Sequence, residues 1–446
     1  MGIDHPAASS DDAPACAELV ASRSADLAGT VTVPGDKSIS HRALILAAMI
    51  KGTSRIGGLS DALDVQRTRA ALAALGCVFE RSGGSLFVTG GAWHEPAGPI
   101  DCGNSGTTAR LLMGALAGRG TKAELMGDGS LSGRPMARVT DPLRAMGAKI
   151  EGGETLPLRL RGGELRSHRH VNRPPSAQVK SALLLAGLNA GVEIEIAETQ
   201  PTRDHLERML PIFGVAVEQR ASAEGSIICL PPNARMRPTE IDIPGDMSSA
   251  AFPLAAALLC TRSEVTVQGV GTNPLRTGIV DTLNQMGADI RSGAERDQAG
   301  EPVADLTART SRLRGVTVSA DQVPRMIDEY PILAIAAASA EGETVMHGLA
   351  ELRVKESDRL AALADGLTAC GVRARIEGDS LRVTGGPVPG GTTISTQGDH
   401  RIAMAFLVLG LVSEAPIRVN GADMIATSFP GFAALMRSLG ARIEAA

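Results

Sequence analysis

The residues best suited to chemistry stand where a short glycine turn leads into an apolar helical run. In the segment GDKSISHRALILAAM, which starts at Gly35, the side chains of Lys37, Ser38 and Arg42 fall on the first turns of the expected helix. Free backbone N–H groups and the helix dipole favour an anion at such a position. The segment therefore predicts a phosphate or carboxylate site, although an isolated charged helix start is more often a solvent-exposed cap.

A second turn of this kind, GNSGTTAR from Gly103, enters the apolar run LLMGALAG. Its small residues let the backbone approach a ligand closely, whereas the alternative interpretation is a plain helix N-cap built on Ser105 or Thr107. Further cationic residues recur near such turns: Arg134, Arg138, Arg203, Lys355, Arg359, His400 and Arg401. Each of these alone is explained as a solvated charge, but together they indicate a cleft that gathers anions.

Two carboxylates stand among these cations. Asp328 precedes the apolar run of MIDEYPILAIAAA, and Glu356 lies in the segment RVKESDR. A partly buried acid beside cations is suited to general acid–base catalysis, and an N-cap role for Asp328 is compatible with it. His168 and His170 lack further ligands at a suitable spacing, so their segment is interpreted as a polar loop rather than a metal site.

The elements that must position these residues repeat along the chain. A helical run ends in a large residue followed by glycine, and an extended run then begins, at Leu75-Gly76, Met146-Gly147, Phe213-Gly214, Met286-Gly287, Cys370-Gly371 and Leu439-Gly440. Glycine is the expected left-handed stop of a helix. The turns VPGDKS and IPGDMS place Asp36 and Asp246 210 residues apart. The pattern predicts an α/β (α+β) protein of two similar domains, each built from three repeated units.

The equivalent turns near Pro34 and Pro244 predict where the two domains join. One domain is expected to comprise residues 35–244. The other is expected to be discontinuous, with residues 1–34 and 245–446, and residues 1–28 are expected to form a tail.

Composition excludes several classes of protein. The chain has 446 residues, a net charge of −5, and only 7 Phe, 1 Trp and 1 Tyr, which argues against a nucleic-acid partner bound by base stacking or by backbone charge. No phosphate-loop or dinucleotide-binding glycine motif is present, so no nucleotide cofactor is expected. Without a signal peptide or a membrane-spanning run, the chain is expected to be cytoplasmic and not to bind a membrane. It is also expected to be a monomer. Its six cysteines are expected to be reduced and buried.

Taken together, the motifs resemble those of the 5-enolpyruvylshikimate-3-phosphate (EPSP) synthases, enolpyruvyl transferases of the shikimate pathway. The matching stretches run in the family's order from about Gly29 to the end: PGDKSISHRALILAA, GNSGTTARLL, GDGSLSGRPMAR, PSAQVKSALLLAGL, TRDHLERML, PGDMSSAAFPLAAALL, DEYPILAIAAA, ELRVKESDRLAAL and GDHRIAMAF. The fourth and eighth stretches look closer to the second bacterial branch of the family. The resemblance implies two domains, each of three βαβαββ units around a pseudo-threefold axis, with the active site in the cleft between them.

The resemblance also implies roles for the matching residues. Those on the shikimate 3-phosphate side are Lys37, Ser38, Arg42, Ser176, Ala177, Gln178, Arg203, Asp328 and Lys355. Those on the phosphoenolpyruvate side, where a phosphate and a carboxylate need cationic forks, are Lys37, Gly106, Arg134, Gln178, Arg359 and Arg401. The catalytic groups are Asp328, Glu356 and Lys37. The implied reaction moves the enolpyruvyl group to the 5-hydroxyl of shikimate 3-phosphate and releases phosphate, with no metal and no cofactor.

The chain departs from the family pattern near its C-terminus. Many members have a lysine just before a Phe-Pro pair, where this chain has the run ATSFP at 426–430. The sequence therefore does not identify which group binds phosphate from that side. Gly106 stands where some glyphosate-tolerant members carry alanine. The sequence therefore predicts inhibition by glyphosate, relieved by Gly106→Ala.

Two other functions compete with this interpretation. The related transferase that acts on UDP-N-acetylglucosamine has a reactive cysteine in the loop before its Arg-Pro pair, but here the loop GDGSLSGRP at 127–135 has none. A non-catalytic scaffold that binds phosphorylated metabolites would not need Asp328, Glu356, Lys37 and Arg401 together.

Overall fold

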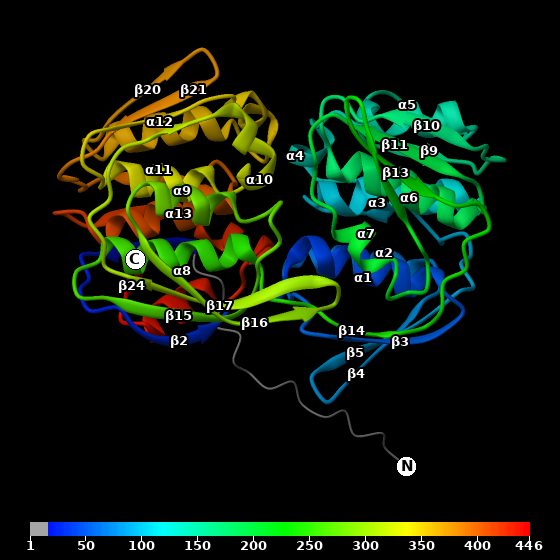
Figure 1. The fold of residues 1–446 in the computed structure, drawn as a ribbon, viewed down its shortest axis with the longest axis horizontal. Coiled ribbons are helices and arrows are strands. Elements are labelled where there is room, and N and C mark those ends of the chain that lie inside the picture. The colour runs from blue at the N-terminus through cyan, green and yellow to red at the C-terminus, as the bar shows by residue number, and fades with distance from the viewer. Residues whose placement is uncertain (1–16) are drawn as a thin grey trace.

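The computed structural model describes residues 17–446, and Figure 1 shows them as two halves lying side by side. Within these residues the strands form six four-stranded sheets with one shared pattern. In each sheet the first two strands are parallel and the remaining neighbours are antiparallel, as the pairs β6–β7, β7–β9 and β8–β9 illustrate. A parallel pair needs a crossover helix, so every unit reads βαβαββ, as predicted.

The first half contains three such units. The first has β14 (Glu240–Asp242), α1 (Lys37–Met49), β3 (Gly52–Gly57), α2 (Leu63–Ala74), β4 (Val78–Ser82) and β5 (Ser85–Gly90). The second has β6 (Ile100–Asp101), α3 (Gly106–Arg119), β7 (Ala123–Met126), α4 (Gly129–Ser132), α5 (Ala137–Met146), β8 (Ile150–Glu151) and β9 (Leu158–Leu160). The third has β10 (His168–Val171), α6 (Ala177–Ala190), β11 (Ile194–Glu198), α7 (His205–Met209), β12 (Glu218–Ser222) and β13 (Gly225–Leu230).

The second half repeats the arrangement. Its first unit has β2 (Ala28–Thr32), α8 (Met247–Leu259), β15 (Glu264–Gly271), α9 (Gly278–Gln285), β16 (Asp289–Gln298) and β17 (Glu301–Arg309). The next has β18 (Thr317–Val318), η1 (Ala320–Gln322), α10 (Val323–Met326), α11 (Tyr330–Ala338), β19 (Glu343–Met346), η2 (Leu349–Val354), α12 (Arg359–Ala369), β20 (Arg373–Glu377) and β21 (Ser380–Thr384). The last has β22 (Thr393–Ser395), α13 (His400–Gly410), β23 (Ile417–Asn420), η3 (Ala422–Thr427), α14 (Phe432–Ser438), β24 (Arg442–Ala445) and β1 (Glu18–Ser22).

The glycines at the six predicted junctions all adopt positive φ, which confirms the helix stops. Their φ angles are 102° at Gly76, 112° at Gly147, 88° at Gly214, 96° at Gly287, 81° at Gly371 and 102° at Gly440. Glycine takes this conformation without the steric penalty of a Cβ atom. The repeat seen in the sequence is therefore a repeat of one backbone unit.

The prediction of a tail over residues 1–28 is wrong for the segment 18–22. This segment forms β1, which pairs with β23 on one side and β24 on the other, although β23 and β24 lie at the far end of the chain. Leu19 and Ala21 point inward and are buried, which is the alternation expected of a strand with one face on a core. Residues 1–16 lie outside the described part.

Two hydrophobic cores lie in the described residues. One is formed by side chains between Ile39 and Ile243, and the other combines residues 19–33 with residues 247–443. Helices α1, α3 and α6 run through the first core, and α8, α11 and α13 through the second. A helix that is apolar all round must be covered on every side, and the surrounding sheets and outer helices provide that cover.

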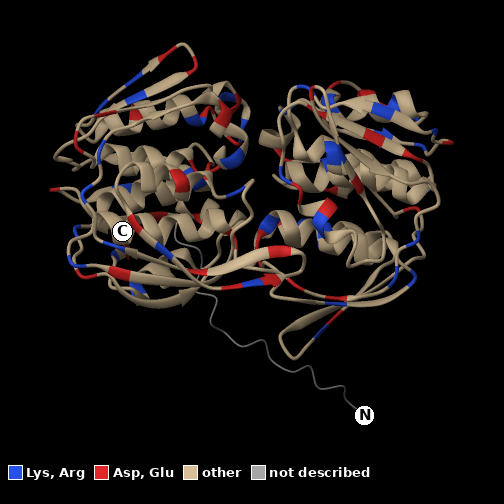
Figure 2. Ribbon diagram, viewed as in Figure 1, with Lys and Arg blue, Asp and Glu red and all other residues tan. Residues whose placement is uncertain are grey.

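Charged residues lie mainly outside these cores (Figure 2). Lys, Arg, Asp and Glu gather on loops, on sheet edges and on the facing sides of the two halves. The cysteines at 77, 102, 229, 260 and 370 are free and buried, as predicted, and Cys16 is not among the described residues. Within residues 17–446, no helix is long and apolar enough to cross a membrane.

Candidate active site

The inner helices of both halves begin where the halves meet. Helices α1, α3 and α6 start at Lys37, Gly106 and Ala177, and the loops before α11 and α13 carry Asp328 and Asp399. A helix start carries partial positive charge from unpaired N–H groups. Several such starts facing one cleft create a site suited to more than one anionic group.

The start of α1 supplies two cations. The Lys37 ammonium lies 2.9 Å from the Asp64 carboxylate, and Arg42 donates to the backbone oxygen of Ser38 at 2.8 Å and to the hydroxyl of Ser181 at 2.9 Å. Burial lowers the pKa of Arg42 to about 10, yet it stays charged at neutral pH. Within residues 17–446 Arg42 forms no ion pair, so its charge is available to a bound anion.

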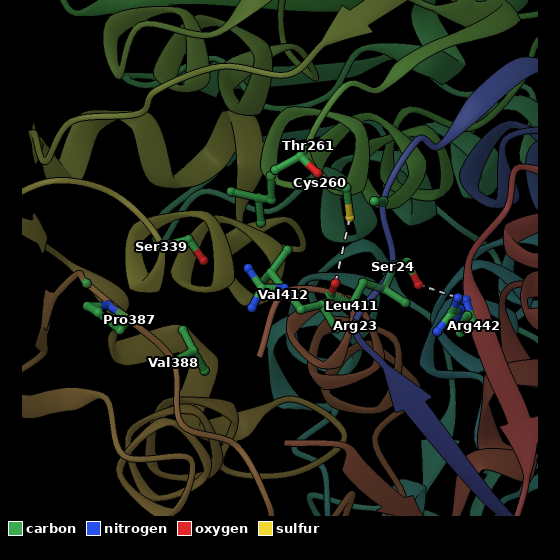
Figure 3. Close-up of a pocket in the computed structure, with 13 residues that line it drawn as sticks. Arg23, Ser24, Cys260, Thr261, Ser339, Pro387, Val388, Leu411, Val412 and Arg442 are labelled. Atoms are coloured by element: carbon green, nitrogen blue, oxygen red, sulfur yellow. Dashed lines mark hydrogen bonds between the residues drawn. The ribbon is translucent and has the colours of Figure 1, made fainter. Parts of the chain in front are cut away.

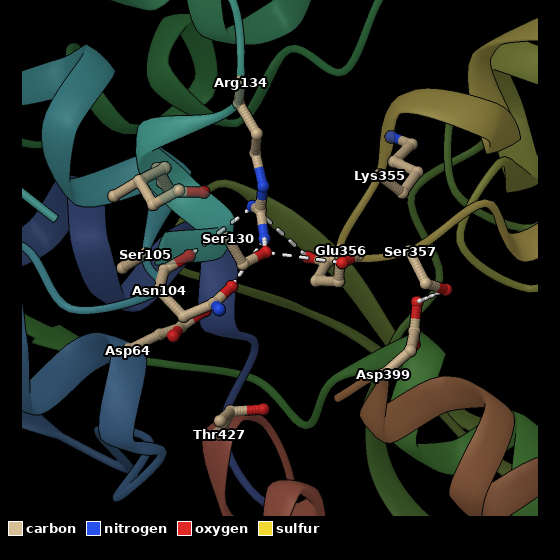
Figure 4. Close-up of polar contacts among 12 residues, drawn as sticks. Asp64, Asn104, Ser105, Ser130, Arg134, Lys355, Glu356, Ser357, Asp399 and Thr427 are labelled. Carbon is tan, nitrogen blue, oxygen red and sulfur yellow. Dashed lines mark hydrogen bonds and ion pairs between the residues drawn. The ribbon is translucent and has the colours of Figure 1, made fainter. Parts of the chain in front are cut away.

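The start of α3 faces a second cationic group (Figure 4). Arg134 donates to the side-chain oxygen of Asn104 at 2.5 Å and to the Ser130 hydroxyl at 3.1 Å. Gly106 is the first residue of α3, and a Cβ atom added there would lie 2.9 Å from Nη1 of Arg110 and 3.5 Å from Nη1 of Arg134. The glycine therefore leaves these guanidinium groups the space they occupy.

The start of α6 joins this region from the third unit. Ser176 caps the helix with its hydroxyl, and Ala177 is the first helical residue. The Gln178 side chain accepts from Arg110 at 2.9 Å and donates to the Thr107 hydroxyl at 2.9 Å. Gln178 thus links α6 to the turn at the start of α3, and the structure brings together these residues from separate sequence motifs.

Asp328 is enclosed by cations from both halves. Arg203, from the loop before α7, pairs with it across the cleft at 2.7 Å, while Arg359 lies 3.5 Å and Lys355 3.9 Å from its other oxygen. Arg401 donates to its backbone oxygen at 3.0 Å. Burial alone would raise the pKa of the Asp328 carboxyl, but the surrounding cations, with Arg203 foremost, hold it well below its ordinary value.

Glu356 occupies a similar position beside Arg359. Its carboxylate contacts Nη2 of Arg359 at 2.5 Å and lies 3.8 Å from Nη1 of Arg134 in the other half. Burial would raise the pKa of Glu356, but Arg359, Arg134 and Lys37 hold it well below its ordinary value. Both candidate acid–base groups are therefore ionised and share cations that a bound anion would also contact.

The two halves contact each other directly at this site. The Ser130 hydroxyl donates to the backbone oxygen of Glu356 at 3.3 Å, as Figure 4 shows, and Arg138 pairs with Glu351 at 2.9 Å. Together with the pair between Arg203 and Asp328, these contacts join the two halves across the site.

The C-terminal segment that lacks the lysine also lies beside the site. Figure 4 shows Thr427 near Asp64 and the turn that carries Asn104. The Thr427 hydroxyl donates to the backbone oxygen of Met424 at 2.7 Å, and the side chain is buried. The described segment 422–430 contains no lysine or arginine, so it supplies no cation to the site from this direction.

A cavity of about 310 Å³ lies elsewhere, in the second half (Figure 3). It is lined by Cys260, Ser339 and Leu411, which stand at the C-terminal ends of α8, α11 and α13. The candidate site lies near the opposite ends of these helices, roughly 15–20 Å away at 1.5 Å per residue. None of the predicted site residues lines this cavity.

Several residues of the site were not given a role by sequence reasoning. Asp64, the partner of Lys37, carries no motif of its own, and Asp399, which binds Arg359 at 2.6 Å, was visible only as part of a Gly-Asp turn. Asn104 and Arg110 stand in a turn that the sequence singled out. The partner of Asn104, Arg134, lies 30 residues further along the same unit, and the partner of Arg110, Gln178, lies in the next unit. Only the folded arrangement reveals these pairings.

Comparison with known proteins identifies the family. The family described as EPSP synthase (3-phosphoshikimate 1-carboxyvinyltransferase) matches residues 21–436. The chain belongs to the EPSP synthase family. It is 53% identical over 433 residues to the 3-phosphoshikimate 1-carboxyvinyltransferase of Phenylobacterium zucineum, which covers 96% of each chain. It is 52% identical over 430 residues to that of Caulobacter vibrioides, which covers 94% of this chain and 97% of the relative.

Solved structures agree with the EPSP synthase fold. The EPSP synthase of Acinetobacter baumannii superposes with a TM-score of 0.84 and 40% identity, covering 96% of this chain and 99% of that one. The enolpyruvyl transferase NikO of Streptomyces tendae superposes with a TM-score of 0.74 at 18% identity, covering 96% and 98%. The second likeness shows the fold alone.

Proposed function

We propose that this EPSP synthase family member transfers the enolpyruvyl group of phosphoenolpyruvate to the 5-hydroxyl of shikimate 3-phosphate, giving 5-enolpyruvylshikimate 3-phosphate and phosphate. The observation that carries this proposal is the pair of buried carboxylates, Asp328 and Glu356, inside one set of cations from both halves. Cations alone would suit a binding scaffold, whereas enclosed acid–base groups suit proton transfer.

Shikimate 3-phosphate is assigned to the side of the cleft formed by α1, α6 and the loop before α7. The residues proposed to bind it are Lys37, Ser38, Arg42, Ser176, Ala177, Gln178, Arg203, Asp328 and Lys355. Arg42 and the start of α1 supply cationic and N–H donors to a phosphate. Asp328 and Lys355 then flank the hydroxyl that reacts.

Phosphoenolpyruvate is assigned to the adjoining side, between the α3 turn and the second half. The residues proposed to bind it are Lys37, Gly106, Arg134, Gln178, Arg359 and Arg401. Arg134 and Arg359 approach Glu356 from opposite halves, and guanidinium forks match the geometry of both carboxylate and phosphate. This supply of arginines accounts for phosphate binding without a lysine at 426–428.

The reaction begins with protonation of the methylene carbon of phosphoenolpyruvate, for which Glu356 is the proposed acid. This creates an oxocarbenium-like centre. The 5-hydroxyl attacks this centre as Asp328 or Lys355 removes its proton, and a tetrahedral intermediate forms. The new methyl group then returns a proton to Glu356 as the carbon–oxygen bond to phosphate breaks, and the proton taken from the 5-hydroxyl passes to the released phosphate. Atoms and charge thus balance without an oxidation or reduction.

Anion binding prepares the carboxylates for these steps. The cations that hold the pKa of Asp328 and Glu356 low are the same groups assigned to the substrates. When a phosphate or carboxylate group takes part of each cation's interaction, the carboxyl loses that stabilisation and its pKa rises toward the range useful for acid–base work. Chemistry is thereby coupled to the presence of both substrates.

The two cores support the predicted division into domains. We assign residues 35–244 to one domain and the segment from β1 through residue 34, together with 245–446, to the other. The chain passes between them at the paired turns, where Gly35 and Gly245 form a β-bridge. Contacts such as that of Arg203 with Asp328 would form on closure, which makes the completed site dependent on domain movement. The monomeric state and the cytoplasmic location stay predictions.

Release of inorganic phosphate from phosphoenolpyruvate tests the proposal. The protein is incubated with phosphoenolpyruvate and either shikimate 3-phosphate or UDP-N-acetylglucosamine, in the presence of EDTA. We expect release with shikimate 3-phosphate only. Release with UDP-N-acetylglucosamine would support the other transferase, and binding of shikimate 3-phosphate without release would support the scaffold function.

A further inference from the structure

A buried ion cluster lies behind the proposed shikimate 3-phosphate side. Its centre is Lys180 on α6, whose side chain is 1% exposed. The ammonium contacts the carboxylates of Glu198 at 2.9 Å and Glu207 at 2.7 Å, and it donates to the backbone oxygen of Thr202 at 3.3 Å. All three donors of the ammonium therefore have acceptors, and none of them faces the cleft.

The cluster connects two elements of the proposed substrate side. Glu198, at the end of β11, accepts from Asn172 at 2.7 Å and from the Thr202 hydroxyl at 2.5 Å. Asn172 in turn donates to the backbone oxygen of Ser176, the cap of α6. Thr202 directly precedes Arg203 in the chain. The cluster thus fixes the turn that carries Arg203 relative to the start of α6.

The cluster also lies close to Arg42, which donates to the hydroxyl of Ser181, the residue that follows Lys180 on α6, at 2.9 Å. Helix α1, which carries Arg42, packs against α7, which carries Glu207. Burial is the main influence that lowers the pKa of Arg42, and the charge of Glu207 is the largest influence that opposes it. Even so, within residues 17–446 the ion pair of Glu207 is made with Lys180, and its Oε2 atom has no hydrogen-bond partner.

We propose that Lys180 is a positioning residue that keeps Glu207 from pairing with Arg42, and so preserves Arg42 for the phosphate group of the substrate. Without the ammonium, Glu207 would be a largely buried carboxylate with no ion-pair partner, and the guanidinium of Arg42, on the neighbouring helix α1, offers a replacement. An Arg42–Glu207 pair would compete directly with a bound phosphate. The inference rests on the proposed function, since it takes Arg42 as part of the shikimate 3-phosphate site.

The test compares Lys180→Met, Glu207→Gln and two double variants of equal net charge. In Lys180→Met, we expect the Kd of shikimate 3-phosphate, measured by calorimetry, to rise roughly tenfold or more, because one partner of a buried ion pair has been removed. The KM for phosphoenolpyruvate, measured at saturating shikimate 3-phosphate, should change less than about threefold. Glu207→Gln alone should bind shikimate 3-phosphate at least as tightly as the parent chain.

The matched double variants separate positioning from mere charge balance. Lys180→Met/Glu207→Gln removes the carboxylate that competes for Arg42, so its Kd should return to within about threefold of the parent value. Lys180→Met/Glu198→Gln has the same charge but leaves Glu207 unpaired, so its Kd should stay high. Melting temperatures of both show whether stability accounts for the difference, and the comparison stands even if Lys180→Met alone fails to fold.

Equal rescue by both double variants, or an unchanged Kd in Lys180→Met, would overturn the inference. The proposed function fails separately, if the parent chain binds shikimate 3-phosphate but releases no phosphate from phosphoenolpyruvate.

Discussion

Helices α1 and α8 begin with the same type of turn but differ in the charge of the residue that follows it. Both follow a Pro-Gly-Asp sequence, and both are capped by the aspartate, which accepts from a backbone N–H of the first turn at 2.9 Å for Asp36 and 3.0 Å for Asp246. The next positions differ, because α1 has Lys37 where α8 has Met247, a buried apolar side chain. The repeat preserved the backbone and the cap in both copies, whereas the cation proposed to bind anions stands in one copy only.

The two capping aspartates also differ, since they lie close together and share Arg276. Burial would raise the pKa of Asp36, but surrounding charges, including Arg276, and hydrogen bonds lower it to about 2. For Asp246, burial and the neighbouring charge of Asp36 raise the pKa to about 6. The pKa values of two equivalent carboxyls are thus shifted in opposite directions, because only one of them can receive most of the stabilisation from the shared cation.

The contrast extends to the two halves. The first half supplies the cations Lys37, Arg42, Arg134 and Arg203. The second half supplies the cations Lys355, Arg359 and Arg401 and also the candidate acid–base groups, Asp328 and Glu356. A duplicated scaffold gives each half similar helix starts, and we propose that both halves bind anions while the carboxylates for proton transfer stand in the second half. The following predictions are arranged around that division.

Making α1 resemble α8 at its first residue should cause the largest loss. In Lys37→Met, we expect the rate of phosphate release at fixed substrate concentrations to fall about a thousandfold or more, because the charge serves both substrates. The matched control is Met247→Leu in α8, which keeps an apolar side chain and should retain most activity. A Lys37→Met variant within tenfold of the parent rate would contradict the assignment of anion binding to α1.

Removing a carboxylate of the second half should affect turnover rather than substrate affinity. For Glu356→Gln we expect kcat to fall roughly 100-fold or more, as for loss of a general acid–base group, with the Kd of shikimate 3-phosphate changed by less than about threefold. Asp358→Asn is the control, because asparagine also caps a helix and Asp358 caps α12. An unchanged kcat with a raised Kd would place Glu356 on the binding side instead.

A methyl group at Gly106 should affect the phosphoenolpyruvate side selectively. In Gly106→Ala, the added Cβ would lie 2.9 Å from Nη1 of Arg110, so this guanidinium must shift, and the methyl group itself occupies space at the start of α3. We expect the inhibition constant of glyphosate to rise about 10- to 100-fold, at ~1.4 kcal/mol for each factor of ten. Gly129→Ala, where a Cβ meets nothing within 4 Å, is the control at the start of α4. Equal inhibition constants in all three proteins would refute this prediction.

The smallest predicted effect is on the pH dependence of stability. The pKa of Asp246 is about 6 in the folded protein, against 3.8 for the ordinary carboxyl group. Protonation of Asp246 therefore favours the folded state. This stabilisation is complete below about pH 4 and is lost as the pH rises through 6. Asp246→Asn is neutral throughout. Between pH 4.5 and 7.5, its free energy of unfolding should therefore lose about 1–3 kcal/mol less than that of the parent chain. Parallel curves in denaturant titrations would contradict the shift.

Much of the fold could be predicted from local patterns, because helix stops and helix starts are signalled by neighbouring residues. A glycine that directly follows a helical run indicates a left-handed helix end, and the aspartate of a Gly-Asp turn indicates the N-cap of the next helix. Strand β1 could not be predicted in this way. It is a short segment whose partners, β23 and β24, lie about 400 residues away, so its stability comes from pairing rather than from its own sequence.

The candidate site could likewise be predicted only in part from the sequence. The residue types that carry charge were identified from their positions in turns, but their partners were not. Arg203 and Asp328 are 125 residues apart in the chain, and Asp64 has no feature that marks it as the partner of Lys37. Arg276, buried between three carboxylates, carries no sequence signal at all. Such pairings are set by packing, which brings distant segments together.

Product formed in D₂O tests the central claim most directly. The parent chain is supplied with shikimate 3-phosphate and phosphoenolpyruvate in D₂O, and phosphate and the organic product are measured by NMR. The account predicts equal amounts of phosphate and enolpyruvyl ether, with deuterium in the methylene group, because the methylene carbon passes through a methyl intermediate. Phosphate without the ether, or an ether free of deuterium, would contradict transfer by protonation, attack and elimination.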